Sequence, residues 1–342
     1  MYQKGRCFAL NELKYVNQKV ELYISNRGKL HKAVLIDEVK VKWKRFGEPG
    51  RLECKILRDG KIDFQEGNAC RLSIDGVKFF HGFVFTKSRD KKPVIDVIIY
   101  DQLRYLKNKY WYVFEDKKAS DMIRFALEDM QLKIGEVEDT QHIFDKYIND
   151  GQSVWDFFSD IVSKSTSVNG KMYALYSDFD AVTLKNVESM GVDYILTYDS
   201  MEDYSYKTSI DGATYNQIVL LSEDKKTKER KIVKSEDAEN IKKWGLLRHF
   251  EKVQNGRNLQ STSNALLEIY NRKERRFEAK NAMGDLRVRG GTLIGAYLPN
   301  LGDINLKSNV LVDEVTHIFS DGKHTMDMRL YNKDVMPTFG GG

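Results

Sequence analysis

The sequence predicts a mainly β fold in which two related β domains flank a middle α+β domain. Three observations carry this prediction. Short runs that alternate apolar and polar residues, separated by glycine turns, fill the first and last parts of the chain. Apolar residues at helical spacing fill the middle part. The end of the first β segment also resembles the end of the last one at a shift of 231 residues.

The first segment, residues 1–112, is predicted to consist of strands. Residues 34–41 and 51–58 alternate with period two at least in part, and residues 94–100 are mostly β-branched or aromatic. Asp59-Gly60 and Asp75-Gly76 predict hairpin turns, because glycine accepts the positive φ that two-residue turns need. Many short strands at this spacing are typical of a small barrel or a sandwich.

The middle segment, residues 113–200, is predicted to be an α+β domain. Ser120 can cap a helix that carries its apolar residues on one face (Met122, Ile123, Ala126, Leu127, Met130). Ser153 and Asp156 form a capping-box pattern before a second helix with its own apolar face (Val154, Phe157, Phe158, Ile161, Val162). Asn169-Gly170 is then predicted to open a hairpin through residues 171–176.

The last segment, residues 201–335, is predicted to be a second β domain with an inserted helix at about 238–272. Residues 215–221 are expected to pair with residues 229–234 across a charged tip. The inserted helix has one apolar side (Leu259, Thr262, Leu266, Leu267, Tyr270). Strands follow at 287–297, and a hairpin turns at Asp321-Gly322. Residues 336–342 are expected to be a flexible tail.

The internal repeat aligns residues 81–101 with residues 312–332 without a gap. Five of the 21 positions are identical, among them Asp96 with Asp327 and Tyr100 with Tyr331. The residues expected to point inward also coincide (Ile95, Val97 and Ile99 with Met326, Met328 and Leu330). Two related β domains are the preferred interpretation, and chance similarity between two amphipathic hairpins is the alternative.

Charge is divided unevenly along the 342 residues. Residues 1–112 carry 24 Lys+Arg against 13 Asp+Glu, whereas residues 113–211 carry 9 against 20. This asymmetry indicates domains with different neighbours. A basic first segment is also compatible with nucleic-acid binding, but no recognition module with interleaved aromatic residues accompanies it. A solvated basic surface is therefore the preferred interpretation.

Secretion and membrane insertion are not expected. The sequence MYQKGRCFALNELKYV has no continuous apolar stretch typical of a signal peptide. The longest charge-free stretch, residues 290–302, is too short and too glycine-rich to span a bilayer. The three cysteines (Cys7, Cys54, Cys70) are too few for a disulfide scaffold or a structural zinc site. Reduced thiols in a protein that folds in a cytoplasm are expected.

No motif in the sequence predicts an enzyme, a cofactor or a metal site. The phosphate-binding G-x-x-x-x-G-K-[ST] and G-x-G-x-x-G patterns are absent, as are G-x-S-x-G, H-E-x-x-H and C-x-x-C. Gly290, Gly291 and Gly295 are better explained by a turning strand or a bulge than by a bound nucleotide. No catalytic, cofactor-binding or metal-binding residue is therefore assigned.

Three groups of residues contain side chains that could form a site, and each has a structural interpretation. His317 and His324 flank a hairpin turn on one side, but no third metal ligand is near in sequence, so they are expected to be strand-surface residues like His31, His81, His142 and His249. The carboxylates Asp199, Glu202 and Asp203 are expected on a solvated face rather than across a sugar. The aromatic residues Trp111, Tyr112, Trp155 and Trp244 are expected to be core or interface anchors.

Several segments in succession resemble one protein family. They are YDQLRYLKN (100–108), SVWDFF (153–158), NGKMY (169–173), WGLL (244–247) and GDLRVRGG (284–291). Together they are similar to the baseplate hub proteins of contractile phage tails and phage-derived bacteriocins, the XkdQ-like group related to the late control protein D family. The resemblance extends from about residue 30 to residue 332, and the order of the segments is more specific than any one of them.

The resemblance implies a fold and a function. Such hubs have two tube-type β-barrel domains on either side of an α+β domain and form a homotrimer. Three chains with two barrels each make a pseudo-sixfold ring, which joins the hexameric tail tube to the trimeric central spike. The resemblance brings no catalytic residue, so a non-enzymatic structural protein is expected.

Partners and location follow from the same resemblance. The expected partners are further copies of this chain, the tail tube or tube initiator protein, the central spike, the baseplate wedge proteins and the tape measure protein, with DNA only in transit through the channel. Assembly is expected in the bacterial cytoplasm, within the baseplate of a virion or a phage-tail-like particle. Two alternatives stay open: a tail-associated cell-wall hydrolase and a basic nucleic-acid-binding module. A muralytic assay tests the first, and salt-sensitive DNA binding tests the second.

Overall fold

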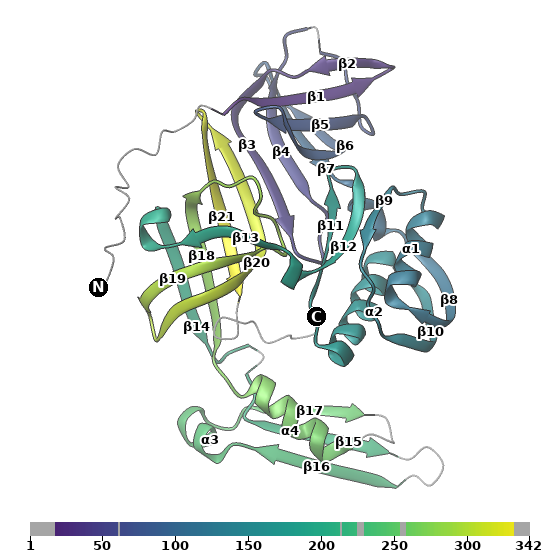
Figure 1. The fold of residues 1–342 in the computed structure, drawn as a ribbon, viewed down its shortest axis with the longest axis vertical. Coiled ribbons are helices and arrows are strands. Elements are labelled where there is room, and N and C mark those ends of the chain that lie inside the picture. Colours follow the sequence, from purple (N-terminus) through teal and green to yellow (C-terminus); the bar gives the residue numbers. More distant parts are fainter. Residues whose placement is uncertain (1–17, 61, 213, 224–228, 254–257, 332–342) are drawn as a thin grey trace, which may run out of the picture.

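The computed structural model describes residues 18–60, 62–212, 214–223, 229–253 and 258–331 (Figure 1). Cys7 and the expected tail at 336–342 lie outside these ranges. In the described part of the chain, no helix is long and apolar enough to cross a membrane. Cys54 and Cys70 are both free and buried.

Most strands belong to one 13-stranded sheet, and its first half comes from the N-terminal segment. Its strands in chain order are β1 (Val20–Asn26), β2 (Lys29–Lys32), β3 (Leu35–Lys44), β4 (Arg51–Leu57), β5 (Ala69–Ile74), β6 (Val77–Arg89) and β7 (Val94–Tyr100). Adjacent strands are antiparallel in the order β3-β4-β7-β6-β5-β1-β2. Asp75-Gly76 turns the β5–β6 hairpin as predicted. The hairpin predicted at Asp59-Gly60 is wrong. β4 pairs with β3 and β7, and a long loop follows β4.

The other half of this sheet comes from the C-terminal segment. Its elements are β13 (Gly191–Leu196), η3 (Tyr198–Ser200), β14 (Asp203–Ser209), β18 (Glu274–Met283), β19 (Leu293–Leu301), β20 (Ile304–Ser320) and β21 (Lys323–Tyr331). The antiparallel order β14-β18-β21-β20-β19 matches the order β3-β4-β7-β6-β5 of the first half. β13, which the predicted boundary at 200 gives to the middle domain, pairs in parallel with β19. Both halves are thus built on one strand order.

The two halves join directly where β20 pairs with β3. The pairing is antiparallel and runs from Glu314 opposite Lys44 to Phe319 opposite Val39. Buried residues of both halves form a single hydrophobic cluster, which includes Leu52, Val97, Val315 and Met328. The mainly β fold that the sequence predicts is confirmed, and its two β segments are parts of one continuous sheet.

The two aligned segments of the repeat bury the same faces but pair their strands in different registers. Ile95, Val97 and Ile99 are buried, as are Met326, Met328 and Leu330. Val84 faces Ile99, yet Val315 faces Met328 instead of the Leu330 that the ungapped shift requires. Four residues link β6 to β7, whereas two link β20 to β21, so the pairing moves by two residues and the inward face is kept.

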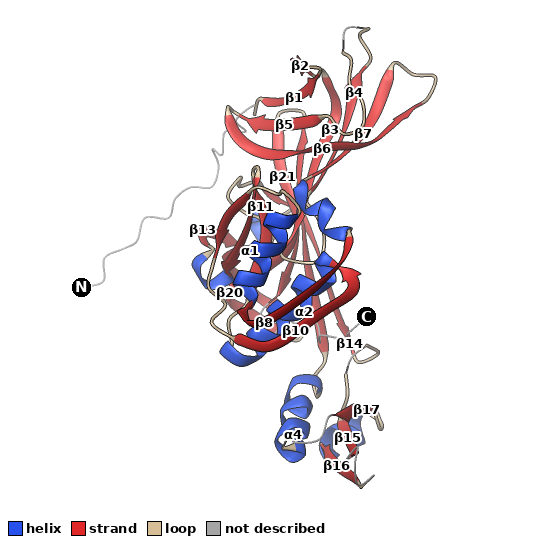
Figure 2. Ribbon diagram, turned by 90° about the vertical axis from the view of Figure 1, so that its right-hand side faces the viewer, coloured by secondary structure: helices blue, strands red, loops and turns tan. Residues whose placement is uncertain are grey.

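The middle module, residues 109–189, surrounds a second hydrophobic cluster. It contains β8 (Lys109–Lys118), α1 (Ala119–Asp129), β9 (Ile134–Val137), β10 (Ile143–Ser153), α2 (Val154–Asn169), β11 (Tyr173–Asp178), β12 (Ala181–Asn186) and η2 (Val187–Ser189), and η1 (Gln102–Lys107) leads into it. The helices lie between the pair β8–β10 and the sheet β11-β12-β9 (Figure 1), and Figure 2 shows β8 and β10 in front of them. Both predicted helices and their apolar faces are confirmed.

Capping contacts define where these helices begin and end. Ser153 caps α2 as predicted, because its Oγ accepts a hydrogen bond from Asp156 N at 3.1 Å. Ser120 does not cap α1; it lies inside the helix, and its N–H donates to Thr140 Oγ1 at 3.1 Å. Gly170 has φ +71° and ends α2 as a left-handed C-cap, so the hairpin predicted there is wrong. The following hairpin turns later, between β11 and β12.

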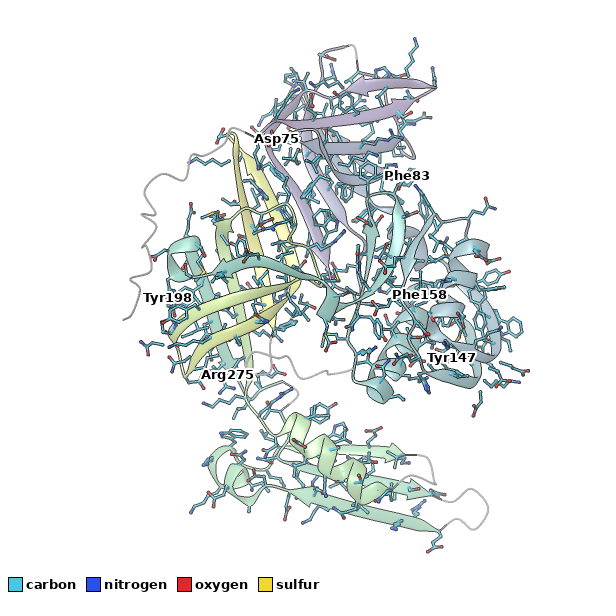
Figure 3. All side chains as sticks on the ribbon, in the orientation of Figure 1. Asp75, Phe83, Tyr147, Phe158, Tyr198 and Arg275 are labelled. Atoms are coloured by element: carbon cyan, nitrogen blue, oxygen red, sulfur yellow. The ribbon has the colours of Figure 1, made fainter. Side chains whose placement is uncertain are left out.

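The small unit, residues 214–272, projects from the ends of β14 and β18 (Figure 1). It contains β15 (Gln217–Glu223), β16 (Arg230–Glu236), α3 (Ala238–Trp244), β17 (Arg248–Val253) and α4 (Leu259–Tyr270). The predicted pairing of β15 with β16 is confirmed. The prediction of a single inserted helix at about 238–272 is wrong. Two short helices, α3 and α4, flank β17, which pairs in parallel with β15. At the base of the unit, the Arg275 guanidinium, labelled in Figure 3, lies 3.0 Å from the Asp303 carboxylate.

Candidate functional site

One face of the joined sheet is apolar and the opposite face is charged. Along β3, Val39, Val41 and Trp43 are buried, so Lys40, Lys42 and Lys44 point to the other face. These lysines lie at the line where the two halves of the sheet meet. We call this surface the charged face.

Ion pairs cross the charged face from one half of the sheet to the other. Arg329 lies 3.5 Å from Glu278 on β18 and 3.6 Å from Glu314 on β20. Glu314 in turn lies 3.1 Å from Lys42 and 3.8 Å from Lys44 on β3. Each such pair contributes little alone because the side chains are partly solvated. Together they place opposite charges on neighbouring strands and keep this face hydrophilic.

The segment Val288–Gly291 lies where the two halves of the sheet and the middle module meet, and we call this place the junction. A Cβ at Gly290 would be 2.2 Å from the carbonyl carbon of Lys44, so only glycine lets the two backbones approach this closely. Gly291 has φ +99° and donates its N–H to Val312 O at 2.7 Å. Of the glycines predicted to belong to a turning strand, Gly290 therefore makes a contact between the two halves of the sheet, whereas Gly295 lies within β19.

Two arginines fix the junction to β11 of the middle module. Arg289 Nη2 donates to Ser177 O at 2.8 Å, and its guanidinium stacks 3.9 Å from the ring centre of Tyr176. Arg45 Nη1 donates to Tyr173 O at 2.8 Å and lies 3.6 Å from the Asp313 carboxylate. Burial lowers the pKa of both guanidinium groups, although both stay charged.

Asp101 ties the end of β7 to the junction. Its carboxylate accepts hydrogen bonds from Gly50 N at 2.9 Å and from Leu103 N at 3.0 Å, which caps η1. Burial raises its pKa to about 7, while those two bonds and the charge of Arg289 act in the opposite direction. In the sequence, Asp101 is marked only by its place in the segment YDQLRYLKN (100–108). The sequence feature that could have identified its role is an Asp placed two residues before a backbone N–H that its side chain can cap.

His317 is buried and forms a hydrogen-bonded pair with His324, which is partly exposed, so the prediction of a strand-surface histidine is wrong for His317. His317 Nε2 donates to Val288 O at 2.9 Å, and its Nδ1 therefore accepts from His324 Nε2 at 2.8 Å. Phe319 stacks on His324 with ring centres 4.4 Å apart. In the described part of the chain, no group of three or more His, Cys, Asp or Glu residues could hold a metal. The other four histidines are partly exposed.

Acid is expected to weaken the fold through this pair. Burial lowers the pKa of His317 to about 3 and that of His324 to about 4, from an ordinary value of 6.5. Both rings therefore stay neutral in the folded chain while the unfolded chain binds protons below pH 6.5. The free energy of unfolding should fall between pH 6.5 and 4 by up to about 1.4 kcal/mol per pH unit for each ring.

Urea unfolding at pH 7, 6 and 5 measures this loss. A double variant, His317→Leu with His324→Leu, should show a shallower pH dependence than the wild type, whatever its stability at pH 7. Equal slopes for the two proteins would contradict the prediction.

The remaining candidate residues, the carboxylates and the aromatic side chains, do not come together in one site. Asp199, Glu202 and Asp203 are exposed, and Glu202 accepts a hydrogen bond from Asn281 Nδ2 at 2.8 Å. Tyr112 and Trp155 are core residues as predicted, and Trp244 is half-buried. Trp111 is exposed and so does not anchor the core.

Solved structures with this fold are phage tail proteins and related secretion components. The 43 kDa tail protein of prophage MuSo2 from Shewanella oneidensis has a TM-score of 0.67 and 14% identity, over 93% of this chain and 100% of that one. The tail protein from Neisseria meningitidis MC58 has a TM-score of 0.62 and 12% identity, over 92% and 97%. The E. coli c3393 protein, a component of the type VI secretion system, has a TM-score of 0.56 and 9% identity, over 93% and 79%. The fold is thus that of phage tail proteins.

Sequence comparison gives the family. The YQBQ-like family model matches residues 39–331, and the chain belongs to that family. The phage-like element PBSX protein XkdQ of Bacillus subtilis (strain 168) is 26% identical over 314 residues, which cover 89% of this chain and 94% of that protein. The resemblance drawn from the sequence segments is confirmed.

Proposed function

We propose that the chain is the hub subunit of a contractile-tail baseplate, a homotrimeric adaptor between the hexameric tail tube and the trimeric central spike. The observation that carries this proposal is the repeated strand order within one continuous sheet. Three copies of a chain with two equivalent halves present six similar units around one axis, which suits a sixfold partner on one side and a threefold partner on the other. Family membership and the fold of tail proteins support a structural role in the tail.

Each half of the sheet is proposed to be a tube-type barrel that arose by duplication. Hydrogen bonds at the β2–β3 bend support this for the first half. Ala33 N donates to Leu22 O and Leu57 N donates to Val34 O, both at 2.9 Å. One continuous stretch of chain therefore pairs with β1 on one side and β4 on the other, at the two ends of the run β4-β7-β6-β5-β1. Such a connection brings the ends of a sheet together.

The native mass of the purified chain tests the proposal first. Light scattering should give about three times the 39.7 kDa of one chain, and negative-stain images should show rings with a central hole. Added spike and tube proteins should bind opposite sides of the ring. A single-chain mass that persists in the presence of both partners would overturn the proposal. Cytoplasmic assembly and the wedge and tape measure contacts belong to the same proposal.

Docking to the tube is proposed to involve Lys40, Lys42 and Lys44. Reversing all three charges should weaken tube binding, but the structure shows that Lys42 and Lys44 also pair with Glu314 inside the chain. The reversal alone is therefore expected to cost about 1–2 kcal/mol of stability as well.

A compensated variant separates the two effects. Adding Glu314→Lys to the three reversals restores opposite charges across β3 and β20, but it also places a second positive charge beside Arg329, so it should restore only part of the stability. Tube binding by this variant should remain weak in a co-sedimentation assay. Binding equal to that of the wild type would exclude the three lysines from the docking surface.

A further inference from the structure

Among the residues that the structure describes, only α4 covers the sheet of the small unit, and it covers one side. Ile218 and Leu220 are buried beneath α4, and Ser235, which lies opposite Ile218, donates to Asn264 on that helix at 2.6 Å. The alternate residues point to the other side. We call these the open sheet face: Val219, Leu221, Ile232 and Phe250. Ile232 is 66% exposed and Phe250 is 55% exposed.

Cross-strand pairing makes the open sheet face contiguous, and basic residues surround it. Val219 lies opposite Phe250, and Leu221 lies opposite Ile232. The surrounding positions on the same side hold four basic and two acidic residues (Arg230, Lys234, Arg248 and Lys252; Glu223 and Glu236). The whole small unit carries 12 Lys+Arg against 8 Asp+Glu. A contiguous apolar face of this kind is typical of an interaction site.

The middle module has a second uncovered apolar sheet face. Tyr112 and Phe114 of β8 are buried in its core, so their neighbours Trp111 and Val113 point outward. Ile148 of β10 lies opposite Val113. Trp111 is 59% exposed and Ile148 is 50% exposed. We call Trp111, Val113 and Ile148 the module face. The module carries 9 Lys+Arg against 15 Asp+Glu over residues 109–189, the opposite sign to the small unit.

We propose that the open sheet face of one copy packs on the module face of a second copy. Both faces stay exposed within one chain, both are flat strand surfaces, and their units have opposite net charge. Apolar sheet faces pack together about 10 Å apart, and the charge difference attracts the two units. Because the two surfaces differ, the contact is head-to-tail, and a rotation axis closes such contacts into a ring. The inference rests on the proposed homotrimer and names one of its contacts.

Charged substitutions test the contact through the native mass. Phe250→Asp and Ile148→Asp each place a carboxylate in one face and should reduce the mass from three chains to one. Ile269→Asp on α4 and Val168→Asp on α2 are matched controls, because each alters an exposed apolar residue of the same unit outside the proposed faces. Both controls should keep the wild-type mass.

Cysteine pairing tests the head-to-tail geometry. Chains with Phe250→Cys and chains with Ile148→Cys are co-expressed in a Cys7→Ser background, in which Cys54 and Cys70 are buried. Oxidation should link one chain of each kind, and neither kind expressed alone should form a linked pair. Linkage between two Phe250→Cys chains would overturn the inference, because it would join two copies of the same face.

The outcomes separate this inference from the proposed function. A wild-type mass of three chains, with both Asp variants unchanged and no mixed disulfide, overturns the contact and leaves the hub proposal standing. A wild-type chain that stays monomeric in the presence of the spike and tube proteins and forms no mixed disulfide overturns the contact and the homotrimer together.

Discussion

Replacing Gly290 by alanine is expected to lower the free energy of unfolding by about 3 kcal/mol or more. The added Cβ would lie 2.2 Å from the carbonyl carbon of Lys44 and 2.4 Å from the nitrogen of Arg45. Both are backbone atoms at the end of β3, and Arg45 is held there by backbone hydrogen bonds with Asp313 and Leu175. The collision cannot be relieved by a side-chain rotation. The end of β3 must move away from the middle module or from the other half of the sheet.

Urea unfolding followed by tryptophan fluorescence measures this effect, and Gly295→Ala is the matched control. Gly295 lies in β19, its φ is not positive, and the nearest atom to an added Cβ is 3.5 Å away. Its substitution should change stability by no more than about 0.5–1 kcal/mol. Equal unfolding midpoints for the two variants would show that the junction tolerates a methyl group.

Arg289→Ala is expected to lower the free energy of unfolding by about 2–4 kcal/mol. The substitution leaves the carbonyl of Ser177 without its 2.8 Å donor and removes the guanidinium from between Tyr176 and Trp43. It also removes a positive charge that lowers the pKa of the buried Asp101 carboxyl. That pKa should therefore rise further, and Asp101 should bind a proton at a higher pH.

Two comparisons make this result specific. Arg289→Lys keeps the charge but loses the planar stack, so its stability should lie between those of the wild type and Arg289→Ala. Arg287→Ala removes an exposed neighbour that pairs with Asp285 at 2.6 Å, and it should cost less than about 1 kcal/mol. A loss for Arg287→Ala as large as that for Arg289→Ala would refute the role assigned to the junction.

Local signals in the sequence predicted the elements well. Periodicity located the helices α1 and α2, and the hairpin at Asp321-Gly322 turns where predicted. The same kind of dipeptide signal failed at Asn169-Gly170. Asn169-Gly170 contains the left-handed residue that a hairpin needs, but a helix C-cap needs it too, and the preceding helix decides between them.

The junction and the burial of His317 could not be predicted from local patterns. Gly290 meets Lys44, which is separated from it by more than 200 residues, and no periodicity reports such a contact. The sequence placed His317 on the correct side of its hairpin. The residues that cover this side belong to other parts of the chain: Phe79 lies in β6, and Val288 lies in the segment before β19. The sequence segments that resemble the family include the junction residues 284–291, so the family pattern marked this region without explaining it.

The joining of β3 with β20 also bears on how the protein is made. β3 ends at residue 44 and its partner strand begins at residue 304. A ribosome adds about 5–20 residues per second, so this side of β3 waits on the order of ten seconds to a minute for its partner. An unpaired strand edge invites pairing with another chain, and lysines at such an edge oppose it. Lys40, Lys42 and Lys44 place like charges along this edge of β3, and these charges are expected to oppose such pairing until β20 has been made.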